Sequence, residues 1–108
     1  MNKQKKAKEN LNYSDLTSNQ YKTFSSQPRF SIMLLLFTHE IIRTKDLSQL
    51  LSLSKGNLDH HLRILEQNQL VSKKVKVFPK RLYSSIEITE KGKKHLESYI
   101  RKLKKFLP

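Results

Sequence analysis

Two amphipathic segments that lie only a few residues apart constrain the fold of this chain more than any other feature. In residues 45–52, leucines recur at i, i+3 and i+4, which predicts a helix that Thr44 caps. In residues 55–68, leucines at i, i+4 and i+7 predict a second helix, which Ser54 caps. Leu53 lies in the turn between them, so the segment predicts helix, short turn and helix. The apolar positions are Leu47, Leu50, Leu51, Leu58, Leu62 and Leu65.

The segments before this pair predict two further helices and a minimal strand. A helix is expected over Asn12–Phe24, with Leu16 and Phe24 on its buried face. Pro28 suits the first position of the next helix, where its missing N–H is not needed. The apolar run Ile32–Phe37 fits a buried strand or a buried helix, and its Met and Leu content favours a central helix. Ile41–Ile42 is long enough only for a minimal strand.

The segments after the pair predict a β-hairpin and a last helix. Residues 70–78 and 82–89 read as strands, because β-branched residues recur in both and Pro79 lies in the turn between them. Thr89 is expected to cap a helix that runs from Glu90 to about Phe106.

Positive charge is concentrated in a few places along the chain. The net charge is +13, from 22 Lys and Arg against 9 Asp and Glu. Residues 11–72 are nearly neutral, whereas residues 73–81 hold five cations and no acid, and both ends are basic. A charge this large on 108 residues predicts a polyanionic partner. The hairpin tip suits phosphate contact or minor-groove insertion, although lysines at a strand edge also serve as a solvated surface.

The polar face of the 55–68 helix offers groups that suit base edges and phosphates. Arg63 can pair with guanine, while Gln67 and Asn57 can read adenine. Gly56 lets a phosphate approach the helix N-terminus, and Asp59 either accepts from cytosine or disfavours wrong partners. The plainer alternative is a solvated face. The predicted DNA-contacting residues are Ser54, Lys55, Gly56, Asn57, Asp59, His60, Arg63, Gln67, Lys74, Lys76, Lys80 and Arg81.

The last helix carries an apolar stripe at 4-3-4 spacing and a basic opposite side. The stripe is too short for an independent coiled coil, so it packs on its own domain or on a second copy. A two-fold related pair of reading helices is usual for helix-turn-helix proteins, which favours a homodimer. The expected dimer residues are Leu16, Phe24, Leu96, Tyr99, Ile100, Leu103, Phe106 and Leu107.

Together these segments predict a mostly helical α+β fold. We expect a winged helix-turn-helix with a two-stranded wing and with added N- and C-terminal helices. Residues 1–27 would form a basic arm with a helix, and residues 28–90 the winged-helix DNA-binding domain. Residues 91–108 would form a C-terminal dimerisation helix.

Three stretches resemble a known family. The sequence SKGNLDHHLRILEQNQLV at 54–71 resembles the signature of single-domain MarR-like winged-helix transcription regulators of archaea and bacteria. IEITEKGKKHLESYI at 86–100 is similar to the end of the family's wing and the helix after it, and PRFSIMLLL at 28–36 to its opening helix. The resemblance covers about residues 26–105. It implies homodimeric DNA binding, reading by the 55–68 helix, wing contacts near Lys76–Arg81, and a dimer interface made by the terminal helices.

The sequence departs from the family pattern at two places. Gln69 stands where the family has a glycine after the reading helix, so Asn68 is expected to supply the left-handed turn. The family's Arg-Pro-Arg pattern in the wing appears only loosely, as Phe78-Pro79-Lys80-Arg81.

Several classes of function lack support in the sequence. There is no cysteine, no Gly-rich phosphate loop and no recognisable Ser/His/Asp arrangement. The four histidines do not pair with carboxylates at metal-ligand spacing, and His61 is expected to be a half-buried structural residue. We therefore expect no enzyme activity, no cofactor and no metal, and no residue argues for a small-molecule effector. The longest apolar run is far short of a membrane span, which predicts a cytoplasmic protein with no membrane partner.

Three functions stay open at this point. A homodimeric, sequence-specific regulator on double-stranded DNA is favoured. An architectural protein that coats DNA without sequence choice fits the +13 charge equally well, because phosphate contacts carry no sequence information. A winged helix used as a protein-interaction module or membrane-surface adaptor is the third, and the basic wing argues against it.

Overall fold

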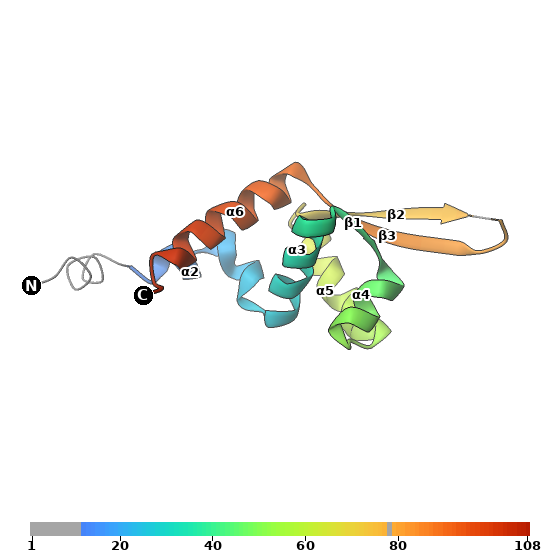
Figure 1. Cartoon of the computed structure of the whole chain (residues 1–108), viewed down its shortest axis with the longest axis horizontal. Helices are drawn as coiled ribbons and strands as arrows, with labels where there is room; N and C mark the ends of the chain where they lie inside the picture. The colour runs from blue at the N-terminus through green and yellow to red at the C-terminus, as the bar shows by residue number, and fades with distance from the viewer. Residues whose placement is uncertain (1–11, 78) are drawn as a thin grey trace, which may run out of the picture.

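The computed structural model describes residues 12–77 and 79–108, so residues 1–11 of the expected basic arm and Phe78 of the expected turn lie outside the described residues. The strands form one antiparallel sheet in the order β1-β3-β2 (Figure 1). The helices hold more residues than the three strands, so the expected mostly helical α+β fold is confirmed. The elements are α2 (Ser14–Thr17), the 3-10 helix η1 (Asn19–Ser25), α3 (Gln27–His39), β1 (Ile41–Arg43), α4 (Thr44–Leu51), α5 (Lys55–Gln67), β2 (Val71–Val77), β3 (Leu82–Ile88) and α6 (Glu90–Lys104).

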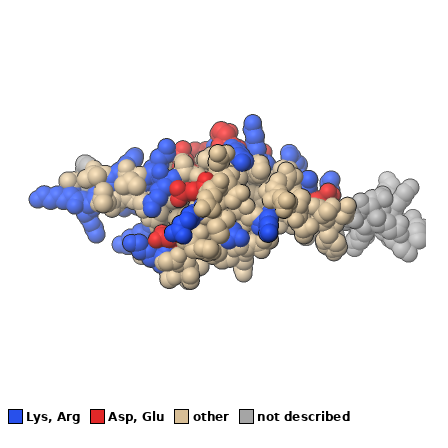
Figure 2. Space-filling model, turned by 180° about the vertical axis from the view of Figure 1, so that it is seen from behind, with Lys and Arg blue, Asp and Glu red and all other residues tan. Residues whose placement is uncertain are grey.

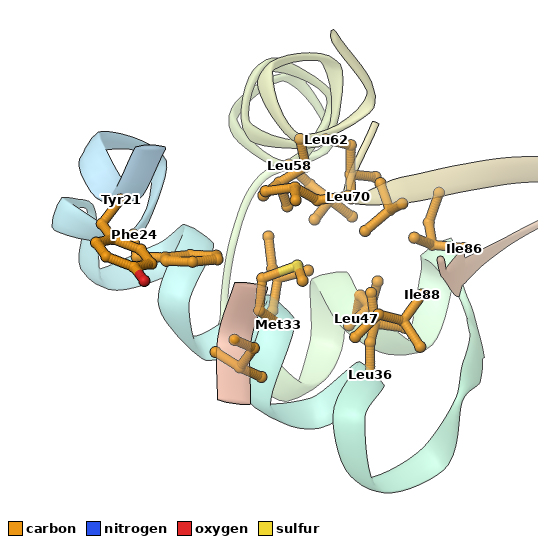
Figure 3. Close-up of a cluster of buried hydrophobic side chains, with 14 residues drawn as sticks. Tyr21, Phe24, Met33, Leu36, Leu47, Leu58, Leu62, Leu70, Ile86 and Ile88 are labelled. Atoms are coloured by element: carbon orange, nitrogen blue, oxygen red, sulfur yellow. The ribbon is translucent and has the colours of Figure 1, made fainter. Parts of the chain in front are cut away.

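The helix α3 is the centre of the core. Ser26 caps it by accepting a hydrogen bond from the Arg29 amide. Pro28 is the second residue of the helix, one position later than expected, and still lies in the first turn, where its missing N–H is not needed. The apolar run in this segment is a helix and not a strand, and Ile32, Met33 and Leu36 are fully buried. Figure 3 shows leucines of α5 and isoleucines of the sheet converging on these side chains. Full burial of each such side chain contributes about 1.5–3 kcal/mol, so α3 holds the other elements together.

The turn between α4 and α5 forms as the sequence predicts. Ser52 takes a left-handed conformation with φ 52°, which ends α4. The Ser54 hydroxyl accepts a hydrogen bond from the Asn57 amide at 3.2 Å, so Ser54 is confirmed as the N-cap of α5. The leucine stripe of α5 is buried throughout, which leaves the opposite side of this helix free.

Two expectations about α4 are wrong. Arg43, and not Thr44, occupies the N-cap position, because the Thr44 hydroxyl bonds to Ser84 on β3. Leu47 is fully buried, but Leu50 is 62% exposed. The spacing shows that these leucines lie near one another on the helix, but α3 and the sheet cover only the side that carries Leu47.

The hairpin of residues 71–88 is called the wing from here on. Its two strands pair over their whole length, from Val71 opposite Ile88 to Val77 opposite Leu82. Only the base of the wing packs on the helices, where Val71, Ile86 and Ile88 are buried. The outer part projects away from the body of the molecule (Figure 1).

The single helix expected over residues 12–24 is wrong. Ser18 is extended, with φ −60° and ψ 157°, and separates the short α2 from the 3-10 helix η1. In a 3-10 helix residues three apart lie on the same side, so Tyr21 and Phe24 both face the core. Their ring centroids lie 5.3 and 5.1 Å from that of Tyr99 on α6. This aromatic packing outweighs the weak helical pattern of the segment.

The start of α6 is fastened to the loop between α5 and β2. The Thr89 hydroxyl accepts from the Gly92 amide at 2.9 Å, which confirms the predicted cap, and donates to the Gln69 carbonyl at 2.7 Å. Gln69 itself has φ 60°, so the expectation that Asn68 supplies the left-handed turn is wrong. Asn68 keeps a negative φ and donates its side-chain amide to the Ile64 carbonyl.

At Gly92, helix α6 lies directly against the backbone of Leu70, and this close contact predicts an effect of substitution on stability. A Cβ at this position would lie 2.2 Å from the Leu70 carbonyl oxygen, which belongs to the backbone and cannot turn aside. We expect Gly92→Ala to lower the free energy of unfolding by about 2–3 kcal/mol, measured by urea denaturation.

Gly56 is the matched control for this prediction. It also lies in a helix, but a Cβ there would meet no atom within 4 Å. Gly56→Ala should therefore raise the free energy of unfolding by about 0.5–1 kcal/mol. Equal effects of the two substitutions would contradict the packing described here.

Candidate nucleic-acid interface

The free side of α5 carries the polar residues that the sequence singled out. Asn57, His60, Arg63 and Gln67 are exposed along it, together with Lys55 and Gly56 at its start. Asp59 is half-buried at the flank, and the Ser54 hydroxyl is engaged in the cap. Because the leucine stripe is buried on α3 and the sheet, these side chains point away from the core. The arrangement can present hydrogen-bonding groups to a flat or grooved polyanion.

Two hollows connect α5 to the wing. The first lies between α4, α5 and β3, and the second runs along the later turns of α5. Lys73 on β2 and Asp59 on α5 line both hollows. The first hollow is lined by Thr44, Lys45, Ser48, Gln49, Lys55, Leu58, Asp59, Lys73 and Ser84. The two helices and the base of the wing thus form one continuous surface.

Lys45 and Lys73 are two cations of this surface that the analysis of the sequence missed. Lys73 is two residues beyond the buried Val71, so strand alternation places both on the same face of β2. That alternation was the available signal. For Lys45 the signal was its position at the start of a helix whose partner is α5.

The predicted wing lysines divide between the two faces of the hairpin. Lys74 and Lys76 alternate with Lys73, so they lie on the face opposite to it. Lys80 and Arg81 lie at the exposed tip. Figure 2 shows Lys and Arg side chains gathered at the wing end of the molecule. The structure therefore brings Lys73 toward α5 and places the other wing cations at the tip or on the far face.

Contacts with β1 and α4 hold the wing at its base. Arg43 lies over the Tyr83 ring, 4.3 Å from its centroid, and β1 pairs with β3 from Ile41 opposite Glu87 to Arg43 opposite Ser85. The hydroxyls of Thr44 and Ser84 are hydrogen-bonded. These contacts set the direction of the wing relative to α5.

A polar cluster joins α5 to α3 and η1. The Arg29 guanidinium donates to the Thr23 carbonyl at 2.8 Å and contacts Nδ1 of His61 at 3.2 Å. Arginine is only a donor, so Nδ1 accepts and the ring proton lies on Nε2. Burial lowers the pKa of His61, and the positive charges of Arg29 and His60 lower it further. His61 is half-buried, as the sequence predicts, and acts as a neutral acceptor within the fold.

The residues expected at a dimer interface separate into two groups. Phe24 and Leu96 are buried in the chain's own core, so assigning them to a contact between copies is wrong. The Phe106 ring stacks on Tyr13, with centroids 5.2 Å apart, and Leu107 is exposed. The members that keep accessible surface are Leu16, Tyr99, Ile100, Leu103, Phe106 and Leu107.

Within residues 12–77 and 79–108, no three His, Asp or Glu side chains come together as a metal site would require. In the same residues, no helix combines the length and apolar character needed to cross a membrane.

Comparisons with known proteins agree with this geometry. A family model described as a winged helix DNA-binding domain matches residues 29–107. An uncharacterised protein of Methanocaldococcus jannaschii is 38% identical over 79 residues, which cover 73% of this chain and 86% of that protein.

Solved structures are also similar. A transcriptional regulator homologue from Pyrococcus horikoshii OT3 has a TM-score of 0.81 and 26% identity, and the match covers 87% of this chain and 91% of that one. MepR from S. aureus, solved as a DNA complex, has a TM-score of 0.68 at 18% identity over 81% of this chain and 72% of its own. At that identity the likeness concerns the fold.

The lowered pKa of His61 predicts a pH dependence of stability. The folded chain binds the His61 proton less tightly than the unfolded chain, whose pKa is near 6.5. The free energy of unfolding should therefore fall as the pH drops from about 6.5 toward the lowered pKa. His61→Asn keeps an acceptor close to the Nδ1 position but does not titrate. We expect Tm to fall less in this variant than in the wild type between about pH 7.5 and 5.5. An equal fall in both proteins would contradict the assignment.

Proposed function

Because the chain belongs to the winged-helix DNA-binding domain family, we propose that it is a sequence-specific transcriptional regulator of double-stranded DNA. It acts as a homodimer, with α5 in the major groove and the wing on the phosphate backbone. The observation that carries the proposal is the continuous surface formed by the free side of α5, the two hollows and the basic wing. The family and its structural neighbours are regulators rather than enzymes.

The chemistry of α5 supports base reading. Its exposed side combines one guanidinium, on Arg63, with the amides of Asn57 and Gln67. These are the groups that pair in bidentate fashion with guanine and adenine in the major groove. Ser54, Lys55 and Gly56 lie at the helix N-terminus, where free amides attract a phosphate. Residues 28–90 then form the DNA-binding unit.

Most of the cations lie beside α5 and not on it, which supports separate roles: the cations contact the phosphate backbone and α5 reads the bases. Lys45 and Lys73 flank the helix, and Lys74, Lys76, Lys80 and Arg81 lie on the wing. Cations placed beside a reading helix fix its register on the duplex without reading sequence. MepR from S. aureus, which shares this fold, was solved in complex with DNA, and this supports DNA as the partner of the present chain.

A homodimer is supported by the unfilled apolar surface at the end of α6. Leu107 is 65% exposed and Tyr13, on which Phe106 stacks, is 74% exposed. The α6 helix of a second copy, related by a two-fold axis, would bury these side chains. The same axis would give the dimer two α5 helices, one for each half-site of the DNA.

Non-specific coating of DNA is the second candidate, because most of the positive charge lies outside α5. Selection of binding sites from random duplexes at about 0.15 M salt distinguishes the two functions. Recovery of a motif supports the regulator, and recovery of none supports the architectural role.

Substitutions on α5 and on the wing tip should have different consequences. We expect Arg63→Ala to weaken binding to a selected site by about 1–3 kcal/mol and to have little effect on random DNA, since it removes a base contact. Lys80→Ala should weaken both duplexes similarly and reduce the slope of log K against log salt by about 1. Fluorescence anisotropy titrations at several salt concentrations measure both effects. If Arg63→Ala left the ratio of the two affinities unchanged, α5 would not be the reading helix.

If two copies associate through the end of α6, a charged substitution at Leu107 should weaken the dimer. Because this side chain is exposed, Leu107→Glu should leave folding intact and bring two carboxylates together across the two-fold axis. We expect the dimer dissociation constant to rise by at least about tenfold, measured by sedimentation equilibrium. Leu50→Glu, at the similarly exposed leucine on α4, is the matched control and should leave the dimer unchanged. An equal effect of the two variants would argue against an interface on α6.

A further inference from the structure

The flank of α4 that turns away from α5 borders a hollow that the proposed function does not use. This β1 hollow lies between the end of α3, β1 and α4, and is lined by His39, Ile41, Ile42, Asp46, Gln49 and Leu50. We infer that the β1 hollow is a binding site for a small organic cation with an apolar body, such as an aromatic amine. The site lies outside the surface proposed for DNA, so it goes beyond the proposed function and does not depend on it.

The geometry of α4 separates the β1 hollow from the proposed DNA surface. Asp46 and Leu50 are four residues apart, so they share one side of the helix, and both line the β1 hollow. Lys45 and Ser48 share another side and line the hollow between α4, α5 and β3 instead. Gln49 lies between the two sides and borders both hollows. A ligand in the β1 hollow and a duplex on α5 can therefore be bound at the same time.

The walls of the β1 hollow are apolar and open to solvent. Leu50 is 62% exposed and Ile41 is 44% exposed, and Ile42 is half-buried beside them. The cavity measures about 490 Å³, within the range of about 300–1,000 Å³ that is usual for small-molecule sites. A flat apolar body such as an aromatic ring would cover these side chains and remove them from water, which favours binding.

The backbone beside the hollow is strained and firmly held. Glu40, which lies between His39 and Ile41, has φ 66° and ψ −48°, a conformation that a residue with a side chain rarely adopts. Its amide donates to the Leu36 carbonyl at 2.7 Å, and its carbonyl accepts from the Ile88 amide at 3.0 Å. Strained residues persist where their surroundings fix them, and they cluster at ligand sites. The turn that carries two of the lining residues is thus fixed before a ligand arrives.

Charge selects a cation over an anion in this hollow, although the chain as a whole is strongly positive. None of the six lining residues is Lys or Arg, and Asp46 supplies the one carboxylate. Among residues 12–77 and 79–108, Asp46 has no ion pair. The nearby Arg43 guanidinium lies over the Tyr83 ring, and Lys93 pairs with the neighbouring Glu40. An ammonium group in the hollow would therefore find the Asp46 carboxylate available.

The size of the hollow favours a small molecule over a protein partner. Its six lining residues are few compared with the roughly 20–30 residues that each partner contributes to a standard protein interface. A second copy would also add positive charge to a chain of net charge +13, which disfavours contact between copies here. The sequence does not indicate this site, because its residues come from three elements. In the sequence Asp46 has an ordinary place, as an acid in the first turn of a helix.

Three indole compounds with the same body and different charge test the site in the full chain. At neutral pH tryptamine is a cation, tryptophol is neutral and indole-3-propionate is an anion. The chain contains no tryptophan, so indole fluorescence reports on the ligand alone. We expect tryptamine to bind most tightly, with a Kd in the millimolar range, and to shift the methyl NMR signals of Ile41, Ile42 and Leu50. Indole-3-propionate should bind at the hollow at least about threefold more weakly.

Substitutions separate the carboxylate from the apolar wall. Asp46→Asn should weaken tryptamine binding about three- to fivefold and leave tryptophol binding unchanged, since the amide keeps the shape of the side chain but not its charge. Glu97→Gln removes an exposed carboxylate on α6 and is the matched control, expected to leave the binding of both compounds unchanged. Leu50→Ala should weaken both compounds by a similar factor of about two to three, because it removes part of the apolar wall.

Several results would overturn the assignment. It is wrong if tryptamine leaves the methyl signals of Ile41, Ile42 and Leu50 unchanged, or if Asp46→Asn and Glu97→Gln have equal effects. Tighter binding of indole-3-propionate at the hollow would identify an anion site instead. A duplex that the chain binds should leave tryptamine in place, and displacement of tryptamine would contradict the separation from the DNA surface. If the chain binds no duplex, the proposed function fails, whereas the ligand measurements on the hollow still decide the present proposal.

Discussion

The packing of the α5 leucine stripe against α3 is the contact on which the rest of the structure depends. Leu58, Leu62 and Leu65 are almost fully buried beside Met33 and Leu36. This contact decides which side of α5 remains free, and the free side carries Asn57, Arg63 and Gln67. Because the interior is closely packed, the helix cannot turn about its axis without exposing leucines. The proposed reading surface is therefore a consequence of the core.

The wing depends on the same core through its base. Val71, Ile86 and Ile88 are buried, and Thr44 and Arg43 add polar and cation–π contacts to β3. Beyond these anchors the hairpin projects away from the body of the molecule (Figure 1), and its two faces differ in character. The face that continues the α5 surface is apolar toward its outer end, whereas Lys74 and Lys76 lie on the other.

Much of the fold was predictable because its signals are local. Ser54 and Thr89 cap helices as expected, and both wing strands lie where β-branched residues recur. The resemblance to MarR-like winged-helix regulators is confirmed by the family match and by the solved neighbours. Most of the failed expectations concern contacts between distant segments. Tyr21 and Phe24 form a 3-10 helix because Tyr99 lies across from them, about 80 residues away in the case of Tyr21.

The sequence by itself determined the order of the elements, the helix-turn-helix, the buried stripe of α5 and the concentration of charge near the wing tip. A period of 3.6 or 2 and a capping hydroxyl are properties of neighbouring residues, so they can be read without the fold. Only the tertiary structure decided that Phe24 and Leu96 fill the chain's own core and that Leu50 is exposed. The physical reason is that an apolar stripe indicates only which side of a helix or strand must be buried. The segment that packs against this side, and the side chains that stay exposed for a partner, are set by residues that meet only when the chain has folded.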